Sequence, residues 1–586
     1  MFKNIYNKYT SIINGLAFSA IPLISFYLME FYEHNPFEDV RAMAAFFNII
    51  LFELIAWIFY IFIGKAKWAL RLLLTISMMF GLINHYVTLF RSTPFVPWDI
   101  FSIKTATSVA SNYDFTPSKE VIIVTLIFIT LIFWVRFLDF KMEMKLKYRL
   151  IPGVIVVLGL CFFVNKLQDE QFQTKCYLYP FLFTPSYMTK VNGMAVTFAM
   201  DLAYVAVDKP SGYSADKAQK ILEEYEEPEN ENDNDEQEDM PNIIVVMDEA
   251  FSDLSVLGDF ETNEDYMPFV HSLMEGHENT VTGKINVSVC GGNTANSEFE
   301  FLTGNSMYFL PSGSIPYQQY IKDETPSMAS HLSELGYETY AQHPYNSTGW
   351  DRDTVYPLMG FENVSFISDY SNRNYIRDYV SDGSSFQKII DTYENKPIGK
   401  PAFIFNVTMQ NHGGYSEKYS NFETDIKVDG VSNYSLEQYL SLMKVTDSEF
   451  ENLVNYFSNV DEKTVIVFFG DHQPNNAVAG PILSANGIDS EDMTMEQLNS
   501  RYEVPYVVWA NYDIEEAKNA DTSLNYLGAE VLEISGVPTS DYQNFLLELK
   551  KEYPVISAVK TETSGKKADE EMLETYQTIQ YYELFD

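Results

Sequence analysis

The chain has 586 residues, of which 46% are hydrophobic and 20% charged, and its formal net charge is −42. That length exceeds the ~100–200 residues of a usual domain, and the hydrophobic content excludes a disordered chain. The acidic balance excludes a nucleic-acid-binding surface, because a phosphate backbone needs basic patches. Residues 1–166 hold 15 Lys and Arg against 10 Asp and Glu, so the negative charge lies almost entirely beyond them. We therefore expect two different regions in one chain.

The first region is rich in long apolar stretches, and about 20 mostly apolar residues are enough to cross a bilayer. Five stretches qualify, at 11–32, 42–64, 68–90, 120–138 and 149–166. The first is too long for a cleavable signal peptide, and four more follow it. Basic residues gather at the N-terminus and in the second and fourth connections, whereas the first connection is acidic. The positive-inside rule then places the N-terminus in the cytoplasm and the chain after residue 166 outside the cell.

These features predict a five-helix transmembrane domain over residues 1–166 of a multi-pass cell-membrane protein. Residues 167–240 form a mixed linker with a helix-like stretch, Ser214–Tyr225, and an acidic run, Glu226–Asp239. The acidic run cannot form a core and is typical of a solvated tether. Only three cysteines occur, at positions 161, 176 and 290, so the exported part is not a disulfide scaffold.

The pattern changes at Pro241 to short apolar runs separated by helical lengths, which predicts a domain over residues 241–586. Such runs, alternating with amphipathic segments, indicate a mainly parallel central sheet covered by helices on both faces. The predicted strands are Asn242–Met247, Glu338–Ala341, Ala402–Thr408, Thr464–Phe469 and Tyr506–Ala510. In this architecture ligands bind at the carboxyl ends of the strands.

Chemically capable side chains follow four of these strands. Glu249 follows the first, His343 the second, His412 the third, and the pair Asp471-His472 the fourth. The chain has only eight histidines, so three of them just beyond strand ends indicate a site. Two carboxylates and one imidazole suit Mn²⁺ or Mg²⁺ better than a thiolate-rich zinc site, and zinc remains an alternative.

A glycine-rich segment offers a fourth ligand and a nucleophile. Gly291 and Gly292 precede a predicted helix that begins near Thr294. Glycines let a loop approach a ligand closely, and the first amides of a helix attract phosphate oxygens. A hydroxyl bound to a divalent metal loses its proton readily and becomes a useful nucleophile. On spacing alone, the favoured interpretation is that Thr294 or Ser297 serves only as a helix N-cap.

Taken together, these residues resemble the lipoteichoic acid synthases, the glycerophosphate-transferring branch of the alkaline phosphatase and sulfatase superfamily. The similarity covers five spans, a linker and an extracellular sulfatase-like domain, and it includes segments 94–99 and 576–585. It implies one bound Mn²⁺, with Mg²⁺ possible, held by Glu249, Thr294, Asp471 and His472. It also implies a substrate-binding set of His343, Trp350, Arg352 and His412. The first-strand motif departs from the family's usual Glu-Ser-Phe, because Ala250 follows Glu249.

The resemblance implies an enzyme that takes glycerophosphate from phosphatidylglycerol, a membrane lipid, through a phosphorylated Thr294. Diacylglycerol leaves, and the group passes to a glycolipid or a growing polyglycerolphosphate chain. Arg352 suits the phosphate because its planar fork donates two hydrogen bonds, and His343 and His412 are candidates to hold phosphate or move a proton. Two alternatives stay open: a phosphoethanolamine transferase, and a glycerophosphate transferase that acts on a cell-wall polysaccharide.

Overall fold

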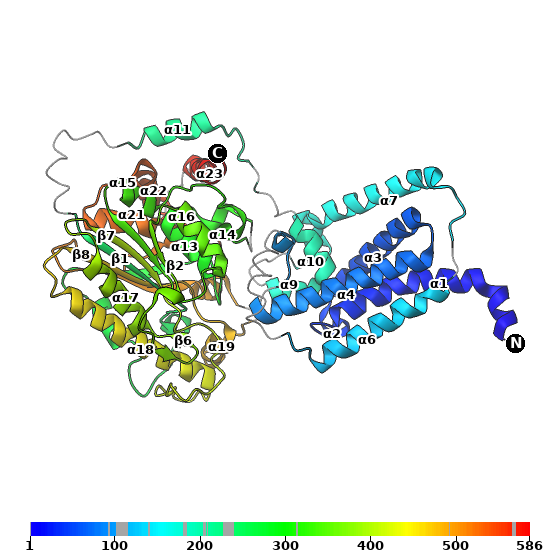
Figure 1. Cartoon of the computed structure of the whole chain (residues 1–586), viewed down its shortest axis with the longest axis horizontal. Coiled ribbons are helices and arrows are strands. Elements are labelled where there is room, and N and C mark those ends of the chain that lie inside the picture. The colour runs from blue at the N-terminus through cyan, green and yellow to red at the C-terminus, as the bar shows by residue number, and fades with distance from the viewer. Residues whose placement is uncertain are drawn as a thin grey trace. The chain divides into compact units, whose positions relative to one another are not determined.

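The computed structural model describes residues 2–586 apart from 92–93, 101–114, 139–140, 180–184, 203–206, 208, 227–239, 312–313, 491–492 and 565–569. Nearly all of the predicted acidic tether therefore lies outside the described residues. The chain divides into two compact units, which we call the helical unit and the sheet unit (Figure 1). The helical unit comprises residues 1–207 with 311–313, and the sheet unit comprises residues 208–310 with 314–586.

The described part of the helical unit contains five long helices. They are α1 (Phe2–Glu30), α3 (Ala42–Ile63), α4 (Ala66–Arg91), α6 (Lys119–Trp134, continued by the 3₁₀ turn Val135–Phe137) and α7 (Leu146–Leu167). Among the described residues, the four from α3 to α7 are long and apolar enough to cross a membrane. The first predicted span falls in α1, which is not among these four, so a count of five spans is not confirmed.

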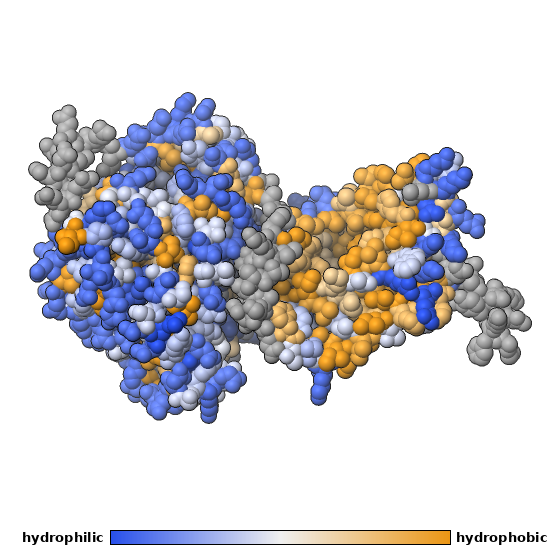
Figure 2. Space-filling view, in the orientation of Figure 1, coloured by the Kyte–Doolittle hydropathy of each residue, from blue (hydrophilic) through white to orange (hydrophobic). Residues whose placement is uncertain are grey.

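The surface of the helical unit is apolar along these helices, as the hydrophobic colouring in Figure 2 shows. Ile127 on α6 and Ile155 on α7, for example, are exposed. Large apolar side chains exposed over several helices indicate a lipid-facing surface. Shorter helices complete the unit, at Pro36–Asp39 (α2), Pro97–Ile100 (η1), Glu170–Lys175 (α8), Pro185–Asn192 (α9) and Met194–Asp201 (α10).

The sheet unit is built on eight strands in the order β10-β2-β9-β8-β1-β7-β3-β4. Their bounds are β1 Asn242–Asp248, β2 Thr280–Asn286, β3 Glu338–Gln342, β4 Asn363–Ser365, β7 Ala402–Val407, β8 Thr464–Gly470, β9 Glu503–Ala510 and β10 Thr522–Ser523. All pairs are parallel except those of β9, which runs antiparallel to both β2 and β8. The mainly parallel sheet and its five predicted strands are confirmed, and β2, β4 and β10 were not predicted.

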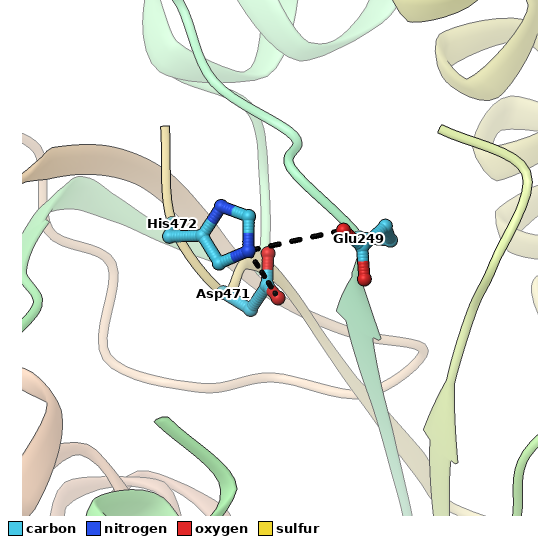
Figure 3. A group of neighbouring side chains, drawn as sticks. All are labelled: Glu249, Asp471 and His472. Carbon is cyan, nitrogen blue, oxygen red and sulfur yellow. Dashed lines mark ion pairs between the residues drawn. The ribbon is translucent and has the colours of Figure 1, made fainter. Parts of the chain in front are cut away.

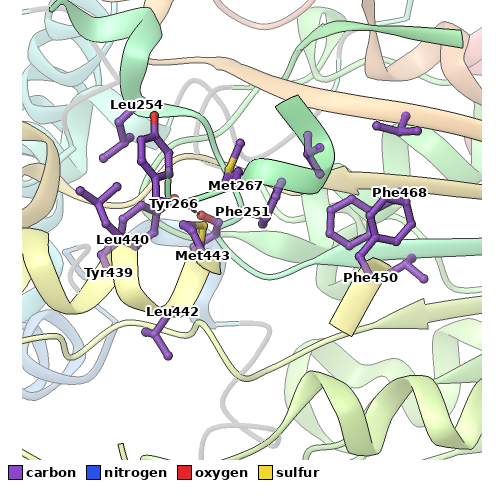
Figure 4. Packing of buried hydrophobic residues seen from close by; sticks show 14 of the residues in the cluster. Phe251, Leu254, Tyr266, Met267, Tyr439, Leu440, Leu442, Met443, Phe450 and Phe468 are labelled. Carbon is purple, nitrogen blue, oxygen red and sulfur yellow. Dashed lines mark hydrogen bonds between the residues drawn. The ribbon is translucent and has the colours of Figure 1, made fainter. Parts of the chain in front are cut away.

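Helices cover both faces of this sheet (Figure 1). One face packs against α12 (Pro268–Met274), α17 (Asp382–Asn395), α18 (Tyr434–Phe457) and α19 (Asn476–Ala485). In Figure 4, Phe450 of α18 lies against Phe468 of β8, with ring centroids 4.1 Å apart and nearly parallel rings. On the other face, Phe301 of α13 (Thr294–Thr303) stacks on Phe405 of β7. Burial of each such ring stabilises the fold by about 2–3 kcal/mol. The packed core therefore holds the ends of the strands in fixed positions.

The remaining helices of the sheet unit lie around this core. They are α11 (Ala215–Glu223), α14 (Pro316–Gln319), α15 (Met328–Glu334), α16 (Arg352–Leu358), α20 (Met495–Ser500), α21 (Leu524–Ser535), α22 (Asp541–Glu552) and α23 (Glu570–Phe585). The predicted helical stretch after residue 213 is confirmed, since the Ser214 hydroxyl caps α11 by accepting from the Lys217 amide. The three cysteines are free.

Candidate active site

Three of the predicted metal ligands meet where β1 and β8 end. The two strands are parallel neighbours with Asp248 opposite Gly470, so the next residues of each strand emerge side by side. One donor atom from each of Glu249, Asp471 and His472 lies within 4.8 Å of the others, and all three side chains are buried. His472 Nε2 is 3.3 Å from Asp471 Oδ2 and 3.8 Å from Glu249 Oε1 (Figure 3).

The turn that carries Glu249 is held tightly against the end of β8. The Ala250 amide donates to Asp471 Oδ1 at 2.7 Å, and the Glu249 amide donates to Thr408 Oγ1 at 3.0 Å. Ala250 adopts φ 53°, a conformation that is uncommon for a residue with a side chain. Gly470 makes this approach possible, because a Cβ at that position would lie 1.8 Å from the Phe251 carbonyl oxygen. The absence of a side chain at residue 470 therefore brings the two ligand-bearing segments together.

The atoms that face one another in this cluster fit a divalent cation. His472 Nδ1 donates to the Gln473 carbonyl at 2.9 Å, which leaves the lone pair on Nε2. Within the described part of the chain, buried His472 Nε2 and Asp471 Oδ2 have no hydrogen-bond partner. Burial, together with the nearby charge of Asp471, raises the pKa of Glu249 to about 8. Oxygen-rich donors with one imidazole are typical of Mn²⁺ or Mg²⁺ sites, although zinc also accepts them.

Thr294 is placed against this cluster by the first turn of α13. Its Oγ1 donates to Glu249 Oε2 at 3.3 Å, and its side chain is buried. The N-cap position belongs to Asn293, which has φ 68° and makes no side-chain cap. Ser297, one turn later, donates to the Asp471 carbonyl at 2.7 Å. Neither hydroxyl serves as a helix cap, and both bind α13 to the ends of β1 and β8.

His343 is buried beside Arg352, which is predicted to bind phosphate. Its Nδ1 donates to the Val407 carbonyl at 3.0 Å, and its Nε2 accepts from Arg352 Nη1 at 3.1 Å. Burial and then the Arg352 charge hold the pKa of His343 well below its ordinary value. The ring is therefore neutral, and both of its nitrogens are engaged in hydrogen bonds, one of them with the Arg352 guanidinium.

Arg352 is anchored by a residue that the sequence reading missed. Its Nε lies 3.0 Å from Glu298 Oε1 and 3.2 Å from Oε2, and its Nη2 also donates to Oε1. The Tyr356 hydroxyl donates to Glu298 Oε2 at 2.7 Å, and both carboxylate and guanidinium are buried. Glu298 follows Thr294 by four residues on α13, so the same helix face carries the predicted nucleophile and the arginine's counter-charge. The four-residue spacing from Thr294 was the sequence feature that could have pointed to Glu298.

The other two predicted substrate residues lie on loops. Trp350 is half-buried in a turn just before α16, where it and Asp351 both have φ 57°. His412 reaches solvent after β7, and its Nδ1 is 3.0 Å from the Tyr379 hydroxyl. Among the described residues, no hydrogen bond joins Trp350 or His412 to the metal-ligand cluster. The eight predicted residues thus form a compact cluster of four, a buried pair and two loop residues, and their functional roles remain predictions.

Comparisons with known proteins agree with this architecture. A sulfatase family model matches residues 241–537, which is half of the chain. A putative cyclic β-1,2-glucan modification protein of Rhizobium meliloti is 32% identical over 62% of this chain and 56% of its own length. Lipoteichoic acid synthase 1 of Bacillus subtilis is 24% identical over 53% of this chain and 48% of its own. The predicted family resemblance is confirmed.

A solved structure shares the fold. The Streptococcus pyogenes phosphoglycerol transferase GacH, in complex with sn-glycerol-1-phosphate, aligns with a TM-score of 0.51 and 21% identity. The alignment covers 64% of this chain and 95% of that one. By contrast, the chain spans about half the length of the curated relatives that it matches.

Proposed function

We propose that this chain, which belongs to the sulfatase family, is a metal-dependent phosphotransferase that moves glycerophosphate from phosphatidylglycerol to an acceptor hydroxyl. The acceptor is a growing polyglycerolphosphate chain or a glycolipid. One observation supports this most directly. The Thr294 hydroxyl is buried 3.3 Å from Glu249 Oε2, beside His472 Nε2 and Asp471 Oδ2, which lie 3.3 Å apart and have no hydrogen-bond partner among the described residues.

Glu249, Thr294, Asp471 and His472 would hold the metal. A bound divalent cation, which we propose is Mn²⁺ with Mg²⁺ as the alternative, would lower the pKa of the Thr294 hydroxyl and offset charge on the phosphoryl oxygens. Glu249 and Asp471 are poised for this because each is a buried carboxylate close to the other. A cation would remove the repulsion that now raises the pKa of Glu249.

The transfer takes two steps. Thr294 Oγ1 attacks the phosphorus of phosphatidylglycerol, an oxygen–phosphorus bond to Thr294 forms, and the bond to diacylglycerol breaks. The acceptor hydroxyl then attacks the same phosphorus and releases Thr294. His412 is our candidate to donate a hydrogen bond to a phosphoryl oxygen, since burial and then the Arg377 charge lower the pKa of its imidazole and favour the neutral ring. The Thr294 proton passes through water to the leaving diacylglycerol oxygen, and the proton of the acceptor hydroxyl returns to Thr294 in the second step. We propose that Arg352, held by Glu298 and His343, binds phosphoryl oxygens through its remaining N–H donors.

A lipid donor fits the composition of the chain. Four described helices are long and apolar enough to cross a membrane. We propose that the N-terminus faces the cytoplasm, that the sheet unit lies outside the cell, and that residues 1–166, 167–240 and 241–586 act as membrane domain, linker and catalytic domain. The strongly acidic sheet unit would not attract an anionic lipid, so the cations at the site must bind the headgroup locally.

A glycan acceptor is the second candidate. It is favoured by the 32% identity to a protein whose description names the modification of a cyclic glucan. The donor chemistry at Thr294 would be unchanged, and only the hydroxyl in the second step would differ. A phosphoethanolamine transferase would use the same nucleophile with a different headgroup.

The test is to look for the covalent intermediate. The full chain in liposomes would be incubated with Mn²⁺ and either phosphatidylglycerol or phosphatidylethanolamine, and the peptide containing Thr294 would be weighed by mass spectrometry. We expect a glycerophosphoryl adduct with phosphatidylglycerol and none in Thr294→Ala, which should keep its fold but release no diacylglycerol. A phosphoethanolamine adduct would select the rival function. Wild-type-like diacylglycerol release from Thr294→Ala would refute the nucleophile.

A further inference from the structure

A short hairpin next to the site makes several contacts with the loop that carries His412. Strands β5 (Tyr375–Ile376) and β6 (Tyr379–Val380) pair antiparallel and are joined by the two-residue turn at 377–378. The Asn421 side chain holds the hairpin from outside by donating to the Tyr375 and Arg377 carbonyls at 3.1 and 3.0 Å. Asn421 therefore holds the hairpin in addition to the contacts that the hairpin makes with the His412 loop.

The turn contains an unusual residue for its conformation. Arg377 has φ 55°, a region where tight hairpin turns favour Gly, Asn or Asp. Its side chain is also only 3% exposed, and among the described residues neither Nε nor Nη1 has a hydrogen-bond acceptor. No salt bridge to a carboxylate is seen for it within the described ranges, whereas Arg352 has Glu298. Strained backbone and a buried charge are both costly, so an arginine here indicates a use for the guanidinium.

That use is visible in its two hydrogen bonds. Nη2 of Arg377 donates to the carbonyls of Gln410 and His412, each at 2.7 Å. The carbonyl between them, that of Asn411, accepts from the Tyr415 hydroxyl at 2.6 Å. Three successive carbonyls of the loop are thus bound by side chains, which leaves little freedom in the backbone that presents the His412 ring.

The second strand of the hairpin fixes the ring itself. The Tyr379 hydroxyl is 3.0 Å from His412 Nδ1, and the two ring centroids are 5.2 Å apart. If the hydroxyl donates to Nδ1, the neutral imidazole carries its proton on Nε2. That atom is then the one that can donate to a phosphoryl oxygen, as the orienting partner of an imidazole usually decides.

We infer that Arg377 and Tyr379 are positioning residues for His412. Arg377 fixes the loop backbone from residue 410 to residue 412, and Tyr379 fixes the orientation and tautomer of the ring. The inference rests on the proposed function only in taking His412 as a residue that contacts the phosphoryl donor or acceptor.

The kinetic test uses variants that separate the hairpin's backbone from its side chains. Arg377→Gly relieves the positive φ and removes the guanidinium, and Tyr379→Phe removes one hydroxyl. Arg373→Gln alters an exposed arginine nearby that donates to the Ile367 carbonyl. On phosphatidylglycerol liposomes we expect kcat to fall about 10–100-fold in the first two and to stay unchanged in the third. In a His412→Ala background, Arg377→Gly and Tyr379→Phe should cause no further loss. Additive losses there would overturn the inference.

A second readout does not depend on the donor lipid. The full chain labelled with ¹⁵N-histidine and held in lipid nanodiscs would give ring signals, with His412 assigned by its loss in His412→Ala. We expect the Nε2–H tautomer in wild type and in Arg373→Gln, and an altered tautomer balance in Tyr379→Phe. Unchanged His412 signals in both hairpin variants would refute the positioning role. Failure of phosphatidylglycerol as donor, with the tautomer result intact, would count against the proposed function alone.

Discussion

The metal side and the substrate side of the site are built in different ways. Glu249, Asp471 and His472 stand directly at the ends of two hydrogen-bonded parallel strands, so backbone pairing alone brings them together. Arg352 begins α16 and His412 lies on a loop, and each is held by side chains from elsewhere, by Glu298 on α13 and by the hairpin at 375–380 respectively. The comparison shows that the sheet supplies the fixed ligands, whereas long side chains supply the orientation of the groups that meet the substrate.

The largest effect should come from a change on the metal side. Asp471→Asn keeps the acceptor for the Ala250 amide but removes a charge, so we expect activity to fall on the order of 10³-fold. Without metal the variant should be more stable than wild type, because a buried carboxylate charge is gone. Thermal unfolding with and without Mn²⁺ checks this. Wild type should gain about 2.7 kcal/mol at a metal concentration of 100 Kd, and the variant almost nothing.

Asp461→Asn is the matched control for this prediction. Asp461 is an exposed carboxylate just before the other end of β8, so its removal should leave both activity and the Mn²⁺ response unchanged. A full Mn²⁺ stabilisation in Asp471→Asn would show that the cluster at the strand ends does not bind the ion.

A change on the substrate side should separate stability from metal binding. Glu298→Gln leaves the Arg352 guanidinium buried without its counter-charge, which costs about 3–5 kcal/mol of unfolding free energy. We also expect kcat/KM to fall about 10²-fold, because Arg352 loses its fixed direction. Denaturant unfolding and Mn²⁺ titration test both halves of this statement, since the metal affinity should hardly change.

The exposed pair Lys551–Glu548 provides the control for the buried one. Lys551→Gln should leave the free energy of unfolding almost unchanged, because solvent screens that pair. A loss of Mn²⁺ binding in Glu298→Gln would mean that the two sides of the site are one unit, contrary to the comparison.

The smallest effect concerns His271 and its two carboxylate partners, which belong to neither the metal side nor the substrate side of the site. His271 Nδ1 of α12 lies 2.8 Å from Asp265 Oδ1, and its Nε2 lies 3.6 Å from Asp253 Oδ2. The interaction with Asp253, followed by that with Asp265, raises the pKa of His271 to about 9. A histidine whose pKa is raised by folding contributes its stability in full below its unfolded pKa of ~6.5 and loses it as the pH rises through about 9. Screening at this partly exposed pair leaves about 1 kcal/mol.

Unfolding measured between pH 6 and pH 10 should show this loss in wild type but not in His271→Gln. Activity per folded molecule should be the same for both proteins at pH 6. A pH dependence that is identical in the two proteins would show that the His271 pair contributes no measurable stability.

The sequence predicted correctly the positions of residues that directly follow the ends of strands. The apolar runs before Glu249 and Asp471 predicted buried parallel strands, and the rule that ligands lie at their carboxyl ends predicted the cluster. It missed β2, because Thr280–Asn286 contains a lysine and a glycine and few apolar residues. It missed Glu298, since a carboxylate in a helix is typical of a solvent-facing surface, and the partner that neutralises it lies 54 residues away. The hairpin was missed because its turn lacks the glycine or asparagine that usually marks one.

The contact between Gly470 and the Phe251 carbonyl has a consequence for recognising active relatives. A homologue with alanine at this position would retain every donor in its sequence, yet its methyl group would wedge the Glu249 turn away from Asp471. A search for the ligand residues would find all of them in such a protein, although these residues could not converge on one metal ion. The residue immediately before the Asp-His pair should therefore distinguish active from inactive relatives better than the ligand residues do.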